Sequence, residues 1–246
     1  MIKIHNTTYI TILIVFLAGY FELIYILLLS IIIHEFGHLF MGLLLNMKVK
    51  YIMIYPFGGI TQFNEKLNVS SNKEFCSLLG GITFQILFLF LIIFLFKKEI
   101  ITKHVYDLII KTNFILISFN FLPILPLDGG RLLNILLDKI IPYKNSLNIT
   151  LITSIIFTIY FLIKKPNLLR MLLTIFLLKN IIIEYKNINN KYTIFLLERY
   201  LYNMKFNKIK KVSTINQLYR DHNHIINNEF EINYLSKLFD RLRQIC

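Results

Sequence analysis

Long apolar segments, separated by short polar intervals, occupy the first three quarters of this 246-residue chain. A membrane-spanning helix needs about 20 mostly apolar residues, and a backbone in hydrocarbon must satisfy its own hydrogen bonds, which favours helices. The segments of this kind are 8–20, 23–45, 74–96, 106–122, 149–163 and 168–183. They predict an all-α polytopic membrane protein with about six transmembrane helices.

The composition fits a chain that lies mostly in lipid. Hydrophobic residues make up 56% of the sequence and charged residues 17%, whereas a typical globular domain carries about 25% charged residues. This balance excludes an ordinary soluble enzyme. The net charge of +13 does not require a nucleic-acid partner, because basic residues of membrane proteins collect in cytoplasmic loops. The distribution of Lys and Arg predicts a multi-pass protein with both termini in the cytosol.

The first apolar segment has an alternative interpretation. Lys3, the apolar residues after it and the sequence Leu17-Ala18-Gly19 resemble a signal peptide and its cleavage site. The second apolar segment follows almost at once, which favours a helical hairpin. Both interpretations stay open.

The polar interval between the second and third segments contains a short apolar run. Residues 51–55 are β-branched and aromatic, and Pro56-Phe57-Gly58-Gly59 follow them. This pattern predicts a strand and a turn. We expect a short re-entrant or interfacial hairpin, because non-helical backbone at a membrane is tolerated where protein covers it. The strand at 51–55 is a candidate for pairing with an extended substrate along its edge.

The composition shifts to Asn, Lys and Tyr after the last apolar segment. We therefore expect a transmembrane domain at 1–185 and a small cytosolic α/β tail at 186–246. The tail would begin with a linker, and its apolar pattern predicts a helix, a strand and a second helix. The linker is expected at 187–192, the first helix at 212–220, the strand at 225–226 and the second helix at 234–242.

The second apolar segment contains the sequence His34-Glu35-Phe36-Gly37-His38. Residues four apart lie on one face of a helix, so both imidazoles project toward a point where they can share a metal ion. The Glu35 side chain can reach a water molecule on that metal. A charge at this depth costs on the order of 3 kcal/mol. A metal site is therefore favoured over a hydrogen-bonded polar cluster that joins helices.

A third ligand must come from another part of the chain, because a catalytic zinc typically takes three protein ligands and one water. Asp128 follows a stretch with two prolines and precedes Gly129-Gly130, in an apolar neighbourhood. Aspartate is also a good N-cap, here for a helix at 131–138. Spacing alone leaves both roles of Asp128 open.

Three stretches of the chain resemble the site-2 protease family of intramembrane zinc metalloproteases. They are the HEFGH sequence at 34–38, YPFGG at 55–59 and NFLPILPLDGGR at 120–131, in that order. The resemblance implies one Zn²⁺ ion bound by His34, His38 and Asp128, with Glu35 as the catalytic acid/base. Weaker candidates for contact with the substrate or its oxyanion are Asn120, Pro123, Phe57, Gly58 and Gly59.

The third apolar segment departs from the family pattern. Many relatives carry Gly-Pro and Asn where this chain has Gly80-Gly81 and Gln85. This difference weakens any role that the resemblance would assign to the segment.

The resemblance also implies a substrate and partners. It points to cleavage of the pro-sequence of a sporulation sigma factor, pro-sigma-K, in the mother cell of an endospore-forming bacterium, under the control of inhibitory membrane partner proteins. Family members of this type carry a C-terminal CBS domain proposed to sense ATP. The tail here is similar to only one short repeat, a truncated CBS-like unit, so ATP binding stays open.

The predicted function is hydrolysis of a peptide bond in or beside the membrane by a zinc metalloendopeptidase. Two other classes stay open. A catalytically silent scaffold or receptor would keep the fold and bind partners. A cation transporter would use the His and Glu side chains as an ion path.

Overall fold

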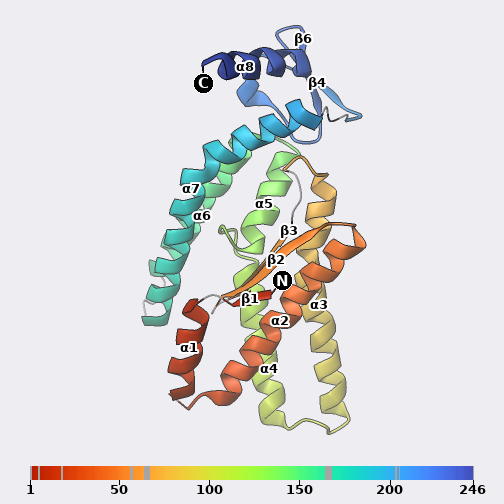
Figure 1. The fold of residues 1–246 in the computed structure, drawn as a ribbon. Helices are drawn as coiled ribbons and strands as arrows, with labels where there is room; N and C mark the ends of the chain where they lie inside the picture. Colours follow the sequence, from red (N-terminus) through yellow and green to blue (C-terminus); the bar gives the residue numbers. More distant parts are fainter. Residues whose placement is uncertain are drawn as a thin grey trace. The chain divides into compact units, whose positions relative to one another are not determined.

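The computed structural model describes residues 2–4, 6–17, 19–55, 58–63, 67–163, 168–202, 204 and 206–245 (Figure 1). The chain is mostly helical and divides into two compact units. The first unit is Met1–Glu65 with Phe75–Phe121, and the second is Lys66–Glu74 with Leu122–Cys246.

The first unit combines a three-stranded sheet with four helices. Its elements in chain order are β1 (Ile2–Ile4), α1 (Asn6–Leu17), α2 (Phe21–Leu44), β2 (Val49–Tyr55), β3 (Gly58–Phe63), α3 (Ser71–Lys97) and α4 (Lys103–Asn120). The first four residues of α3 belong to the second unit.

The expected strand at 51–55 lies within β2, which is the central strand of its sheet. β2 pairs in parallel with β1 and antiparallel with β3. The prediction that 51–55 offers an edge to a substrate is therefore wrong, because both edges of this strand are occupied. Among the strands that the structure describes in this sheet, β3 has only one neighbour, and it packs against α2.

One face of α2 is buried, and its buried positions recur every three or four residues as on an amphipathic helix. They are Ile26, Ser30, Ile31, His34, Glu35, Gly37, His38 and Gly42. The helix approaches α3 closely where two glycines meet. A Cβ atom on Gly37 would lie 2.8 Å from the carbonyl carbon of Gly80. Because neither glycine has a side chain, the two helix backbones lie close together, and α3 packs against the face of α2 that carries the histidines.

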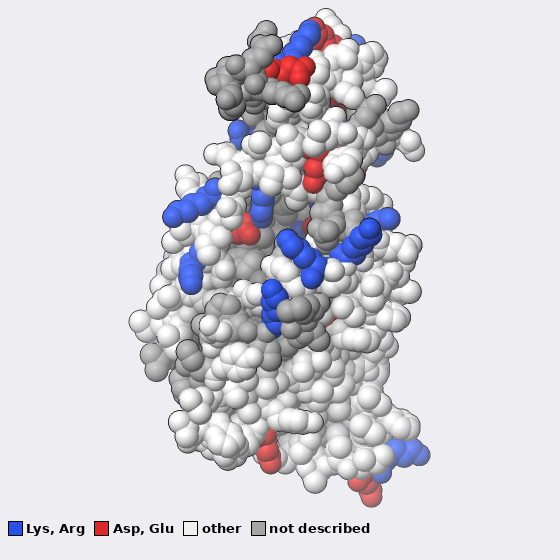
Figure 2. Space-filling view, viewed as in Figure 1, with Lys and Arg blue, Asp and Glu red and all other residues white. Residues whose placement is uncertain are grey.

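Three of the six predicted spans are confirmed as helices long and apolar enough to cross a membrane, namely α2, α3 and α6 (Tyr143–Ile163). Large apolar side chains are exposed on all three helices, and the surface over α2 and α3 in Figure 2 is almost uncharged between the helix ends. The other three predicted spans fall on α1, α4 and α7 (Leu168–Tyr202). The structure therefore supports a membrane protein, while a total of six spans stays a prediction.

The second unit contains three helices followed by a small sheet and a terminal helix. After α5 (Asp128–Asp138), α6 and α7 come β4 (Ile209–Val212), the 3₁₀ helix η1 (Ile215–Gln217), β5 (Asn223–Ile226), β6 (Glu229–Phe230) and α8 (Glu231–Ile245). β5 is central, parallel to β4 and antiparallel to β6.

Two expectations for the tail are wrong. Residues 187–192 are not a linker, because α7 continues through them and buries Ile188 and Tyr192. Residues 212–220 do not form an α-helix. They contain the end of β4 and η1 instead.

Arg199 on α7 joins the tail to the loop before α3. Its guanidinium pairs with Glu231 at 2.8 Å and donates to backbone carbonyls of Tyr219 and His222. Its Nε donates to the side chain of Asn68 at 2.8 Å. The Arg199 side chain is only 3% exposed. This buried charge is therefore stabilised by several hydrogen bonds as well as by its ion pair.

A second buried arginine holds the last residue of α5. Arg220 pairs with Asp138 at 3.3 Å and with Glu74 at 2.6 Å. Burial raises the pKa of Asp138 to about 6, although Arg220 and the hydroxyl of Ser146 oppose this shift. The Ser146 hydroxyl also lies 2.8 Å from the Tyr143 carbonyl, to which it donates. The same hydroxyl donates to the Asp138 carboxylate, so its proton is shared between the two acceptors.

Candidate metal centre

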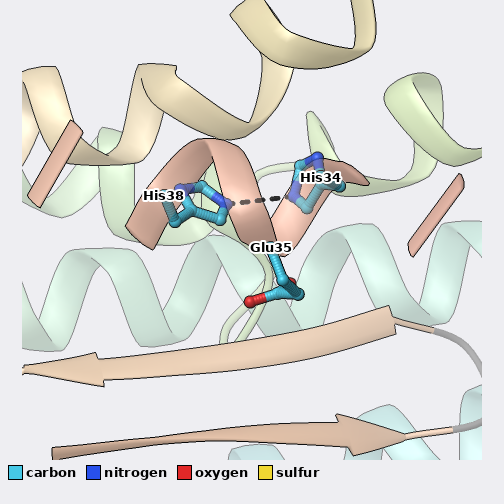
Figure 3. Close-up of side chains that lie close together, drawn as sticks. All are labelled: His34, Glu35 and His38. Atoms are coloured by element: carbon cyan, nitrogen blue, oxygen red, sulfur yellow. Dashed lines mark hydrogen bonds between the residues drawn. The ribbon is translucent and has the colours of Figure 1, made fainter. Parts of the chain in front are cut away.

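His34, Glu35 and His38 form a buried group in the middle of α2. Their exposed fractions are 2%, 4% and 4%, and one potential ligand atom from each residue lies within 4.8 Å of the others. The two imidazole rings face each other from successive turns, while the Glu35 carboxylate points toward the strands (Figure 3). The helical spacing thus produces the convergence that the sequence predicts.

Each imidazole is fixed through its Nδ1 atom by a group on α3. Nδ1 of His38 lies 2.9 Å from the backbone carbonyl of Ser77, and Nδ1 of His34 lies 3.0 Å from Oε1 of Gln85. An acceptor at Nδ1 holds the proton on that nitrogen and leaves the lone pair on Nε2. Such partners commonly orient histidines that bind metals.

The Nε2 atoms of His34 and His38 lie 3.0 Å apart. With protons on both Nδ1 atoms, the two Nε2 lone pairs are directed into the same buried space, where one divalent cation can bind to both. Neutral imidazole nitrogens are ordinary zinc ligands. The residues present therefore fit a zinc ion.

Gly81 on α3 lies directly against the two rings. A Cβ atom at this position would lie 2.5 Å from His38 Nε2 and 2.6 Å from His34 Cε1. Only a residue without a side chain leaves the rings in their present positions.

Glu35 is positioned by β3 rather than by another helix. The Thr61 hydroxyl donates to Glu35 Oε2 at 2.6 Å. A Cβ atom on Gly59 would lie 2.6 Å from Oε1 of the same carboxylate. The backbone of β3 therefore packs against the Glu35 side chain, and the Thr61 hydroxyl of the same strand donates a hydrogen bond to it.

The weaker candidates occupy different surroundings. Asn120, the last residue of α4, directs its amide nitrogen to within 3.3 Å of His34 Nε2. A Cβ at Gly59 would lie against the Glu35 carboxylate, whereas a Cβ at Gly58 would meet nothing within 4 Å. Pro123 lies between α4 and α5, and Phe57 lies outside the described residues.

Asp128 is the first residue of α5 and belongs to the second unit. Its alternative role as an N-cap is wrong, because Leu127 occupies the N-cap position. An acidic residue in the first turn is still favourable beside the positive end of the helix. Its role as the third ligand stays a prediction.

Three residues that hold the site received no role from the sequence: Thr61, and Gly81 and Gln85 in the segment that departs from the family pattern. Gln85 carried a detectable signal, because it is a strongly polar residue inside the long apolar run of α3. The roles of Thr61 and Gly81 depend on which elements pack against α2, which the sequence does not show.

The chain is similar in sequence to known proteins. The family model of peptidase family M50 matches residues 22–100. Stage IV sporulation protein FB of Bacillus subtilis is 31% identical over 189 residues, which are 75% of this chain and 66% of that protein. A zinc metalloprotease of Methanocaldococcus jannaschii is 27% identical over 140 residues, 55% of this chain and 39% of that protein.

The fold has a solved counterpart. The structure of the site-2 protease from Methanocaldococcus jannaschii matches with a TM-score of 0.60 at 21% identity, covering 74% of this chain and 89% of that chain. The helical fold and the buried HExxH helix define the class of site-2 type metalloendopeptidases. The chain belongs to that family, peptidase family M50. It spans about two thirds of the sporulation relative's length and well under half of the archaeal one's.

Proposed function

We propose that the chain is an intramembrane zinc metalloprotease that cleaves a membrane-associated pro-protein. The observation that carries this proposal is the buried pair of converging imidazoles with a separately positioned carboxylate beside it. The named activity of the archaeal relative, a zinc metalloprotease, supports the same chemistry.

His34, His38 and Asp128 would hold a single zinc ion. Two imidazoles and one carboxylate form a usual ligand set for a catalytic zinc site. Zinc bound there would polarise the scissile carbonyl and acidify a water molecule. Gln85 and Ser77 would keep the two imidazoles in place through their Nδ1 atoms.

Glu35 would act as the general base and then as the general acid. Its carboxylate accepts a proton from the attacking water and returns it to the departing amine. Thr61 holds one carboxylate oxygen, so the other oxygen stays available for the proton. The Asn120 amide would donate a hydrogen bond to the oxyanion that develops in the transition state.

The substrate would bind along β3. A peptide bond in a helix is shielded by the helix's own hydrogen bonds, so the substrate must unwind locally. An extended segment can then add to the side of β3 that lies away from β2. Because Gly59 and Thr61 of β3 contact the Glu35 carboxylate, a segment paired there would lie near the catalytic base.

The particular substrate would be pro-sigma-K or a closely similar sporulation sigma factor, because one relative is a sporulation protein. The remaining parts of the proposal are six membrane spans, cytosolic termini and control by inhibitory membrane proteins. The tail would be a truncated CBS-like unit, and an ATP titration of the purified full chain would test nucleotide binding.

Co-expression of the chain with a pro-sigma factor tests the proposal. We expect cleavage by the wild type, none by E35Q, and near-stoichiometric zinc in both purified proteins. D128A should lose zinc. Normal cleavage by E35Q would refute the assigned base, and unchanged zinc in D128A would refute the third ligand. Zinc binding without cleavage of any tested pro-protein would instead support a silent scaffold.

A further inference from the structure

Small polar side chains recur along one face of α6. Ser146, Thr150, Ser154 and Thr158 follow each other at intervals of four residues, and each is 0% exposed. Residues at this spacing lie in a row on one side of a helix. Buried hydroxyls are normally hydrogen-bonded, so the row is expected to contact a neighbouring element. That element is α5, which packs against α6.

Two hydroxyls of this row hold the second half of α5. Ser146 donates to the carboxylate of Asp138, the last residue of that helix. Thr150 donates to the side-chain oxygen of Asn134 at 3.2 Å. These contacts fix the middle and the end of α5 along α6.

Ser154 lies one turn further along the row and contacts the turn before α5. Its Oγ accepts a hydrogen bond from the backbone N–H of Leu125 at 2.9 Å. Its own proton goes to the carbonyl of Thr150, at 2.7 Å within α6. The hydroxyl therefore donates within its own helix and accepts from the turn.

The N–H of Leu125 needs a partner from outside the turn. The N–H groups of Ile124 and Leu127 already bond to backbone carbonyls inside it. Pro123 and Pro126 have no N–H at all. A buried backbone N–H without a partner is costly, and Ser154 supplies that partner to Leu125.

The first turn of α5 packs directly on the peptide bond that Ser154 holds. A Cβ atom on Gly130 would lie 2.6 Å from the carbonyl carbon of Ile124 and 2.7 Å from the nitrogen of Leu125. Ile124 itself is 0% exposed, so this peptide bond has little room to move. Asp128 lies two residues before Gly130 in the same helical turn. A shift of the peptide bond would therefore displace the turn that carries Asp128.

We propose that Ser154 is a positioning residue for Asp128: its hydroxyl fixes the peptide bond between Ile124 and Leu125, and this peptide bond fixes the first turn of α5. The inference rests on the proposed role of Asp128 as the third zinc ligand. Ligand distances in metal sites vary by only about 0.2 Å. A small displacement of the turn is therefore enough to weaken binding by the Asp128 carboxylate.

The first test measures zinc affinity of the full chain in detergent by competition with a chelator. S154A removes the acceptor of the Leu125 N–H, and alanine is the residue that best maintains a helix. We expect zinc affinity to fall about tenfold, at the lower end of the range for groups that orient metal ligands. Wild-type zinc affinity in S154A would overturn the proposal.

T158V is the matched control on the same face of α6. Thr158 is equally buried, and its hydroxyl has no hydrogen-bond partner among the described residues. The substitution keeps the shape of the side chain and should change zinc affinity by less than twofold. Equal loss of zinc affinity in S154A and T158V would overturn the proposal, because any change on this face would then have the same effect.

A spectroscopic measurement separates positioning from stability. Co²⁺ takes the same kinds of ligand as Zn²⁺, and its visible absorption spectrum depends on the geometry of its ligands. At saturating Co²⁺, S154A should have an altered spectrum. T150V loses a hydrogen bond to the middle of α5, so it should have a lower thermal midpoint and the wild-type spectrum. The same spectral change in both variants would overturn the proposal.

G130A tests the second contact and does not depend on the folding of S154A. Its methyl would press on the Ile124–Leu125 peptide bond from the side of α5, so we expect an altered Co²⁺ spectrum and a lower zinc affinity. The wild-type spectrum in G130A would overturn the proposal.

D128A distinguishes failure of this inference from failure of the proposed function. Zinc loss in D128A with wild-type affinity in S154A would overturn the positioning role of Ser154 and leave the proposed protease intact. Wild-type zinc affinity in D128A would refute the third ligand and, with it, this inference.

Discussion

Replacement of Gly81 by alanine tests the geometry of the metal centre most directly. The added methyl would lie 2.5 Å from His38 Nε2, 2.6 Å from His34 Cε1 and 2.8 Å from His38 Cε1. Cβ atoms do not approach other heavy atoms this closely, so the rings or the helices must move. The rings cannot move freely, because Ser77 and Gln85 hold their Nδ1 atoms.

The expected cost follows from overpacking. Extra methyl groups in a packed interior typically cost about 1–3 kcal/mol. If the rings take up this strain by leaving their ligating positions, zinc affinity falls by about 5- to 150-fold, since 1.4 kcal/mol corresponds to a factor of ten. Proteolysis should fall at least as much at limiting zinc.

G80A is the matched control, one residue earlier on the same helix. Its methyl would lie 2.7 Å from Met41 Cγ and 2.9 Å from the carbonyl carbon of Gly37, so it presses on the α2–α3 crossing and not on the imidazoles. We expect G80A to lower the thermal midpoint and to lower zinc affinity less than G81A does, because its methyl touches no imidazole. Chelator competition and thermal melts monitored by circular dichroism measure both quantities. Unchanged zinc affinity in G81A would refute the arrangement of the two rings.

Three further changes have defined outcomes. T61V removes the hydrogen bond to Glu35, worth about 1.5–3 kcal/mol for a charged acceptor, so peptidase assays should show kcat reduced by about 10- to 100-fold with zinc content unchanged. Because the folded-state pKa of Asp138 is about 6, above its unfolded value, protonation stabilises the fold at acidic pH, and this stability is lost as pH rises through 6. Unfolding titrations should therefore show that the wild type gains about 1.4 kcal/mol between pH 7.5 and pH 5 relative to D138N. R199M removes the arginine partner of Glu231, whose carboxylate then keeps, among the described residues, only its hydrogen bonds to His224. Breaking a buried ion pair costs about 3–5 kcal/mol, and limited proteolysis should then cut the tail first.

The parts of the site that lie on one helix were predictable from sequence. The i, i+4 spacing of His34 and His38 fixes their common face once α2 is helical, and the apolar run around them ensures the helix. The strand at 51–55 was likewise predictable from its β-branched and aromatic residues. In both cases the prediction depends only on the residues of a single helix or strand and on their spacing along it.

The partners of these residues were not predictable, because they depend on the register between elements. Gln85 meets His34 only because Gly37 and Gly80 let α2 and α3 approach closely. Thr61 meets Glu35 only because the antiparallel pairing of β3 with β2 sets which side chains of β3 face α2. The linker expected at 187–192 failed for a related reason: buried contacts of Ile188 and Tyr192 stabilise a helix that composition alone disfavours.

α5 connects the proposed third ligand to the tail. It begins with Asp128 and ends with Asp138, about 15 Å apart along a single helix. Asp138 is buried against Arg220, which also binds Glu74 and the Val69 carbonyl before α3. Loss of the tail would remove the arginine that pairs with Asp138, and we expect this loss to destabilise the helix that begins with Asp128.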